Sequence, residues 1–222
     1  MDIERARFNM IEQQIRPWNV LDQDVLDLLA VVRREDFVPP PYRAMAFTDM
    51  EVPLTLDGRQ TGETMLAPKV EARILQELAV RRHESVLEIG AGSGHMAALL
   101  AHRARQVDSL EIDPDLARFA GANLVRAGVQ NAVVRQADGS DPAANLPSYD
   151  VIVLSGSVPF VPEFLLGKLN PGGRLAAIVG ELPVMHAQIM TRAQGAGWAT
   201  AMLFETVARP LLGFPARERF HF

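Results

Sequence analysis

A short apolar run that ends in a glycine-rich turn has the clearest chemical meaning in this sequence. The segment Val86-Leu87-Glu88-Ile89-Gly90-Ala91-Gly92-Ser93-Gly94 is typical of a strand that turns tightly into a helix, here expected over about 93–104. Glycine in such a turn lets a ligand come close to the backbone. The first amides of the helix and its dipole point to the same place. The segment therefore predicts a site for a small, partly anionic ligand.

The acidic residue before the turn helps to decide between two candidate cofactors. A dinucleotide fingerprint has its third glycine where this chain has His95. A carboxylate at Glu88 would repel a pyrophosphate, whereas it would attract the α-ammonium and the sulfonium of S-adenosylmethionine. The pattern favours S-adenosylmethionine over a nicotinamide cofactor. On the glycines alone, a structural turn that binds nothing is the alternative, and Glu88 argues against it.

Two further acidic positions follow later predicted strands. Glu111 ends the second strand, from which a carboxylate can accept hydrogen bonds from both ribose hydroxyls; a solvated strand end is the alternative. Asp138 ends the third strand and is either a contact for the adenine amino group or a plain turn residue. Small residues around Ser155 leave room for a substrate. The expected cofactor-binding residues are Glu88, Gly90, Gly92, Ser93, Gly94, Glu111, Ile112, Asp138, Gly139 and Ser155.

The composition limits the classes of protein that fit. The 222 residues are 48% hydrophobic and carry a formal net charge of −5, which predicts a soluble globular chain and argues against nucleic acid as a partner. Without cysteine there is no disulfide, thiolate zinc site or cysteine nucleophile, and the scattered histidines form no metal pattern, so no metal is expected. No apolar run spans a bilayer and the N-terminus does not resemble a signal peptide, so we expect no membrane partner and a cytoplasmic location.

The elements that position these residues alternate between strands and helices. Strands are expected near 86–89, 107–111, 132–136, 150–154 and 174–179, with one or two more between Trp198 and Leu211. The alternation predicts an α/β fold with a doubly wound, mainly parallel sheet and a ligand at the carboxyl ends of its strands. The part of the chain before the first of these strands begins with apolar residues at helical spacing. It continues with a proline-rich loop at 34–41, a turn-rich loop at 57–62 and a helix at 68–78. We therefore expect an N-terminal helical extension, residues 1–80, and a cofactor-binding domain, residues 81–222.

The motifs together resemble class I S-adenosylmethionine-dependent methyltransferases. The segments that carry this resemblance are 87–94, 138–139, 149–153 and 169–175. Three further segments narrow the resemblance to the protein-L-isoaspartate O-methyltransferase family: Arg33-Arg34-Glu35-Asp36-Phe37-Val38-Pro39, 46–54 and 161–165. The resemblance implies a Rossmann-like fold, S-adenosylmethionine as cofactor, and methyl transfer to the carboxylate of isoaspartyl residues in damaged peptides or proteins. We expect a monomer or a weak homo-oligomer.

One segment departs from the family pattern at the expected substrate site. The family has Gly-Gln-Thr-Ile-Ser-x-Pro, whereas this chain has Gly62-Glu63-Thr64-Met65-Leu66-Ala67-Pro68. Leu66 replaces a serine near the methyl-transfer centre and cannot hydrogen-bond a carboxylate, while Glu63 adds negative charge near an anionic substrate. Thr64 remains as the candidate catalytic residue. A methyltransferase for a different acceptor, and a non-catalytic S-adenosylmethionine-binding protein, are therefore the alternatives.

Overall fold

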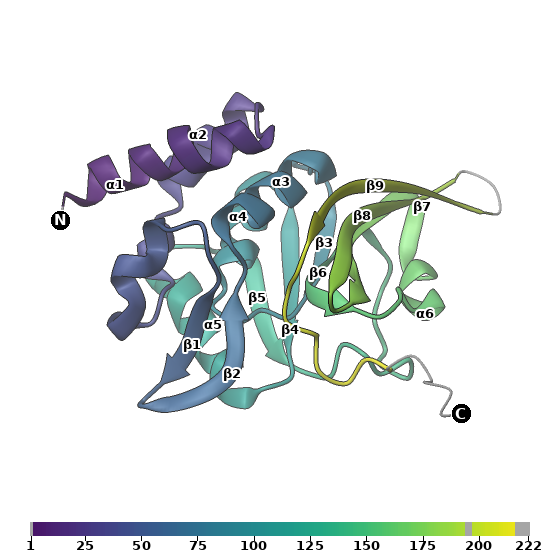
Figure 1. The fold of residues 1–222 in the computed structure, drawn as a ribbon. Coiled ribbons are helices and arrows are strands. Elements are labelled where there is room, and N and C mark those ends of the chain that lie inside the picture. The colour runs from purple at the N-terminus through teal and green to yellow at the C-terminus, as the bar shows by residue number, and fades with distance from the viewer. Residues whose placement is uncertain (1, 194–196, 216–222) are drawn as a thin grey trace.

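Apolar, β-branched runs form the strands of one seven-stranded sheet, in the order β5-β4-β3-β6-β7-β8-β9. The computed structural model describes residues 2–193 and 197–215. Neighbouring strands from β5 to β7 are parallel, whereas β8 and β9 are antiparallel to their neighbours, so the predicted mainly parallel sheet is confirmed (Figure 1). The strands are β3 (Ser85–Ile89), β4 (Gln106–Glu111), β5 (Ala132–Gln136), β6 (Tyr149–Val158), β7 (Leu169–Glu181), β8 (Val184–Arg192) and β9 (Trp198–Thr206).

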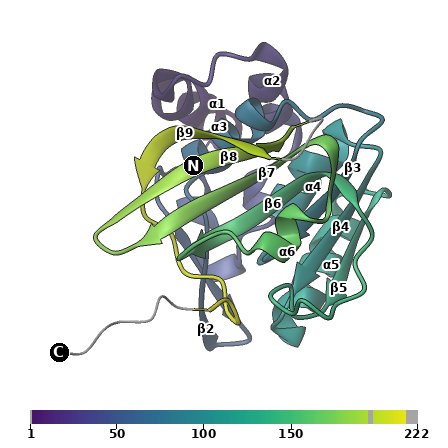
Figure 2. The same ribbon diagram turned by 90° about the vertical axis from the view of Figure 1, so that its right-hand side faces the viewer.

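Helices cover the sheet, and their ends follow from capping residues. In α5 (Pro114–Arg126), Asp113 accepts hydrogen bonds from the amides of Asp115 and Leu116 at 2.7 and 3.2 Å, as its position before a proline predicts. Beyond α3 and α4, the N-terminal α1 and α2 form an outer layer (Figures 1 and 2). The other helices are α1 (Ile3–Met10), α2 (Gln23–Val31), α3 (Pro68–Leu78), α4 (His95–Arg103) and α6 (Glu163–Leu166).

The predicted helix between β5 and β6 is wrong, because residues 137–148 form turns and irregular chain. A helix does separate β6 from β7, as predicted, whereas β8, which the sequence analysis did not predict, forms a hairpin with β7. The predicted loop at 57–62 is also wrong, because β1 (Val52–Leu56) and β2 (Arg59–Met65) are joined by a two-residue turn. The turn residues Asp57 and Gly58 have φ of 49° and 80°. Such a turn matches the twist of a hairpin, which explains why polar residues directly after it are in a strand.

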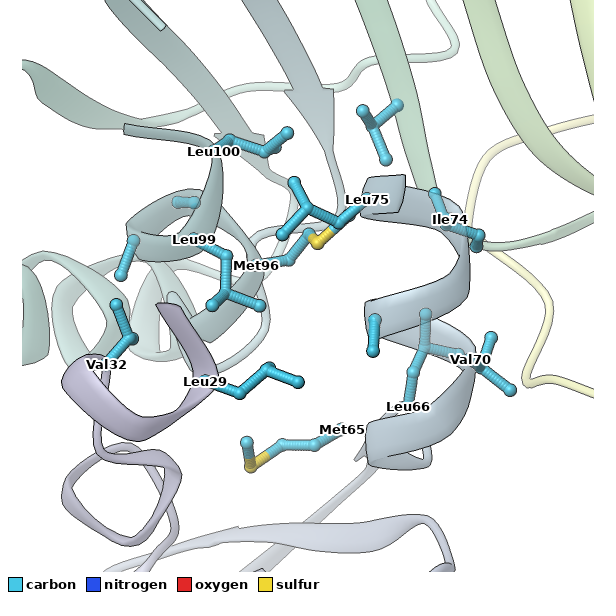
Figure 3. Packing of buried hydrophobic residues seen from close by; sticks show 14 of the residues in the cluster. Leu29, Val32, Met65, Leu66, Val70, Ile74, Leu75, Met96, Leu99 and Leu100 are labelled. Atoms are coloured by element: carbon cyan, nitrogen blue, oxygen red, sulfur yellow. The ribbon is translucent and has the colours of Figure 1, made fainter. Parts of the chain in front are cut away.

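The N-terminal elements and the helices of the sheet share one hydrophobic cluster. Leu29 near the end of α2 packs toward the side chains of α3 and α4, with Leu66, just before α3, beside Val70 (Figure 3). Full burial of a leucine side chain contributes roughly 1.5–3 kcal/mol, so this cluster fixes residues 65–67 against the sheet domain. In the described part of the chain, no helix has the length and apolar character needed to cross a bilayer.

Candidate functional site

The glycine turn after β3 lines a cavity at the carboxyl ends of the parallel strands, with about 520 Å³ of empty space that is in part open to solvent. Gly90 and Gly92 have φ of 91° and 53°, a region that favours glycine. The Gly90 amide donates to the Leu110 carbonyl at 2.8 Å, which fixes the turn against β4. The structure brings these predicted residues together in the cavity wall: Thr64, Gly90, Gly92, Glu111, Ile112, Gly139 and Ser155.

Glu111 connects the turn to the next strand. Its carboxylate accepts the Gly92 amide at 2.8 Å and the Asp113 amide at 3.1 Å, and the residue is 6% exposed. Burial raises the pKa of Glu111, while the amide hydrogen bonds act in the opposite direction. The side chain is therefore held in one orientation with its carboxylate in the cavity wall.

Glu88 lies behind the turn rather than in the wall of this cavity. It is fully buried, and Ser109 and Ser155 donate their hydroxyls to its two carboxylate oxygens at 2.6 and 2.8 Å. Burial raises the pKa of Glu88 to about 8, although the two hydroxyls lower it. Glu88 borders a smaller space of about 260 Å³ together with Ser93. A pKa of about 8 favours the protonated group at neutral pH, which differs from the charged carboxylate that the sequence analysis assumed.

The remaining predicted cofactor residues make structural contacts outside the cavity wall. The Asp138 carboxylate accepts the amide and hydroxyl of Ser140 at 2.8 and 2.6 Å, as a turn residue does. Gly94 lies at the start of α4 with φ of 82°, and a Cβ there would lie 3.0 Å from the carbonyl oxygen of Ala120. Its contact is thus with α5. Neither residue is in the wall of the cavity.

The atypical segment divides between the cavity and the core. Thr64 donates its hydroxyl to the Glu51 carboxylate at 2.9 Å and lines the cavity. Glu63 also lines it; burial and the charge of Glu111 raise the pKa of Glu63, and Arg209 partly offsets this. Leu66, in contrast, is 7% exposed and packs in the core, where it also borders the smaller space beside Glu88 (Figure 3).

A buried charged network, which the sequence did not indicate, lies beneath this segment. Arg34, Glu71 and His95 are each at most 3% exposed. The Glu71 carboxylate accepts from Arg34 and lies 2.9 Å from Nδ1 of His95, and Arg34 also donates to the Leu66 carbonyl at 2.6 Å. Burial alone would raise the pKa of Glu71, but Arg34 and His95 lower it below its ordinary value. The network ties the backbone at Leu66 to α3 and α4.

A second, larger space adjoins the first. It measures about 1430 Å³ and is lined by residues that include Glu51, Arg209 and Leu211. The C-terminal segment is fixed there by Ser157, whose amide donates to the Arg209 carbonyl and whose carbonyl accepts the Leu211 amide, both at 2.8 Å. Leu211 lines both spaces, and its Cδ2 lies 2.7 Å from where a Cβ on Gly90 would be. We call the smaller space the donor cavity and the larger one the acceptor cavity.

The doubly wound sheet, the glycine turn and the acidic residue after the next strand define the class I methyltransferases. Comparison with known proteins then identifies the family. The family model for protein-L-isoaspartate(D-aspartate) O-methyltransferase (PCMT) matches residues 5–209, so the chain belongs to this family. Membership confirms the predicted enzyme class, S-adenosylmethionine as cofactor and isoaspartyl groups as acceptors.

Individual relatives agree with the family match. A protein-L-isoaspartate O-methyltransferase of Herpetosiphon aurantiacus is 34% identical over 95% of this chain and 91% of its own length. Another, from Methanoculleus marisnigri, is 39% identical over 79% of this chain and 78% of its own. A Plasmodium falciparum structure, described as such a methyltransferase in complex with S-adenosyl-L-homocysteine, superimposes with a TM-score of 0.78 at 20% identity. It covers 92% of this chain and 97% of that one. This last similarity concerns the fold.

Proposed function

We propose that this chain transfers the methyl group of S-adenosylmethionine to the α-carboxylate of isoaspartyl residues, with the cofactor in the donor cavity and the peptide in the acceptor cavity. The observation that carries this assignment is the common wall of the two cavities at Leu211. Two substrates that react directly must lie in line and in contact, and adjoining cavities allow this.

The donor cavity has the features that the cofactor requires. Gly90 and Gly92 have no side chains of their own, so a ligand in the cavity can approach the backbone of the turn. The fixed carboxylate of Glu111 is suited to accept hydrogen bonds from ribose hydroxyls. Gly139 and Ser155 complete the wall. When bound, the cofactor supplies a methyl group on a positively charged sulfur.

The acceptor needs little chemical activation. A carboxylate is ionised at neutral pH, so the chain has to position it and exclude water rather than remove a proton. Thr64, at the side of the donor cavity and bonded to Glu51 of the acceptor cavity, is the polar group we assign to positioning. Leu66 lines neither of these two cavities, although it borders the smaller space beside Glu88, so its lack of a hydroxyl removes no group from the two walls. Together with the family match, this favours isoaspartate methylation over a different acceptor or a non-catalytic binding protein.

The wider organisation stays a prediction. Residues 1–80 would contribute Glu51 and Thr64 to the acceptor side, and residues 81–222 would hold the cofactor. The predicted monomer or weak homo-oligomer, the lack of a nucleic-acid partner and the cytoplasmic location are proposals of the same kind.

Methyl transfer from labelled S-adenosylmethionine to an isoaspartyl peptide tests the function, with the matching aspartyl peptide as control. We expect label on the isoaspartyl peptide alone. Calorimetry with S-adenosylhomocysteine on the same sample measures the donor site separately. Binding without transfer would refute the proposed acceptor, and the absence of both would refute the assignment of the cavities. Within the donor site, Glu111→Gln should weaken S-adenosylhomocysteine binding, whereas the matched variant Glu205→Gln on the exposed edge strand β9 should leave it unchanged.

A further inference from the structure

The walls of the two cavities carry an unbalanced set of charges. The donor cavity is lined by Glu63 and Glu111, and the acceptor cavity by Glu51. Within residues 2–193 and 197–215, Arg209 is the one cationic side chain that lines either cavity. An anionic acceptor that approaches these walls therefore meets several carboxyl groups and one positive charge.

Backbone hydrogen bonds fix the position of Arg209, while its guanidinium has no bonding partner among the described residues. Its carbonyl accepts the Ser157 amide at 2.8 Å, and the hydroxyl of Ser157 donates to the neighbouring Ala208 carbonyl at 2.9 Å. The residue is exposed, and its guanidinium makes no hydrogen bond or ion pair with the described part of the chain. Since the backbone is tied to β6, the side chain extends from a fixed point beside both cavities.

The charge of Arg209 also reaches the donor cavity. The positive charge of Arg209 lowers the pKa of the Glu63 carboxyl, whereas the negative charge of Glu111 raises it. Arg209 is therefore close to the boundary where Glu63 and Thr64 line the donor cavity and where the acceptor must meet the methyl group.

We propose that Arg209 determines acceptor specificity by pairing with the carboxylate of the isoaspartyl residue before methyl transfer. This inference rests on the proposed function. A guanidinium pairs with a carboxylate through two parallel hydrogen bonds, which gives both affinity and orientation. Glu51 and Glu63 line the same boundary, and no other described side chain of these walls is cationic, so the charge attraction must come from Arg209.

The chemistry of the step determines how Arg209 acts. A carboxylate oxygen forms a bond to the methyl carbon as the carbon–sulfur bond breaks, and that bond's electron pair stays on the sulfur. The acceptor thus changes from an anion to a neutral ester, and no proton is transferred. An ion pair with Arg209 is strongest with the unreacted acceptor and is lost in the product. Arg209 should therefore affect binding of the acceptor more than the chemical step, and it should favour release of the ester.

The test compares Arg209→Met and Arg209→Lys, with Arg43→Met as the control at an exposed arginine that lines neither cavity. Hydrogen bonds to charged groups contribute enough for a loss of about tenfold or more in affinity. We expect Arg209→Met to raise KM for the isoaspartyl peptide by about this factor and to leave kcat within about twofold. Arg209→Lys should recover part of the loss, because the charge remains. Arg43→Met should behave as the unmodified chain.

Two further measurements separate this role from a structural one. Added salt should raise KM of the unmodified chain more than that of Arg209→Met. Calorimetry with S-adenosylhomocysteine should give the same affinity in every variant, which shows that the donor site is intact. An unchanged KM in Arg209→Met, or a loss of kcat at unchanged KM, would overturn the proposal.

Direct binding distinguishes failure of this inference from failure of the proposed function. The isoaspartyl peptide and its neutral isoasparaginyl analogue are titrated into the unmodified chain and into Arg209→Met. Preference for the anionic peptide that disappears in the variant supports Arg209 even if no methyl transfer is observed. Equal preference in both proteins refutes the role of Arg209, whatever the activity. If Arg209→Met does not fold, the same comparison is made with Arg209→Lys, where a retained preference for the charged peptide is expected and its loss would refute the charge-based role.

Discussion

Replacement of Glu71 by glutamine should strongly destabilise the fold while the walls of the donor and acceptor cavities stay unchanged. Glu71 is 3% exposed and accepts from Arg34, which is 2% exposed. Glu71→Gln keeps the shape of the side chain but leaves the guanidinium of Arg34 buried without a counter-charge. Breaking a buried ion pair from one side costs about 3–5 kcal/mol. For a chain of this size, each kcal/mol moves the thermal midpoint by about 2–4 °C, so the midpoint should fall by about 6–20 °C.

Urea denaturation measures the free energy of unfolding, and the chain provides a matched control on the same helix. Glu77 pairs with Arg73 at 2.7 Å, but its side chain is 29% exposed, so Glu77→Gln should cost less than about 1 kcal/mol. The double variant Arg34→Met/Glu71→Leu removes both charges and should recover most of the stability lost in Glu71→Gln. A loss in Glu71→Gln no larger than that in Glu77→Gln would refute the reasoning.

Three other changes have defined outcomes. Gly90→Ala should lower the affinity for S-adenosylhomocysteine in calorimetry, because its Cβ would lie 2.7 Å from Leu211; Gly58→Ala, also at positive φ but with no atom within 4 Å, should leave that affinity unchanged. Leu66→Ser should cost about 2–5 kcal/mol in denaturant unfolding without raising kcat, since the side chain is in the core; a gain in kcat would contradict this placement. Because burial raises the pKa of Glu88 from 4.5 to about 8, the folded state holds a proton that the unfolded chain releases between these pH values. The free energy of unfolding should therefore fall as pH rises through this range, and less so in Glu88→Gln; equal slopes would show that Glu88 is not responsible.

Local patterns predicted the parts of the fold in which neighbouring residues determine the structure. The strand, glycine turn and helix at 86–104 need only apolar residues and glycines in order. Asp113 before Pro114 similarly fixes the start of α5. These signals are contained in a few consecutive positions, so the sequence is sufficient to identify them.

Features that depend on long-range packing were not predictable in this way. β2 is a strand because it pairs with β1, although its sequence Arg59-Gln60-Thr61-Gly62-Glu63 has no apolar alternation. The contact between Arg34 and Glu71 joins positions 37 residues apart, and nothing local marks either as buried. For Glu88 the sequence gives the charge but not the enclosure by Ser109 and Ser155, and the enclosure decides its protonation.

The shared position of Leu211 has a thermodynamic consequence. Because this single side chain lines both cavities, we expect the binding free energies of donor and acceptor to be linked through it. By reciprocity, any factor by which the cofactor changes affinity for the peptide is also the factor by which the peptide changes affinity for the cofactor. A substitution at Leu211 should alter that coupling as well as each affinity, and a molecule that joins an adenosyl group to an isoaspartyl group must pass this side chain.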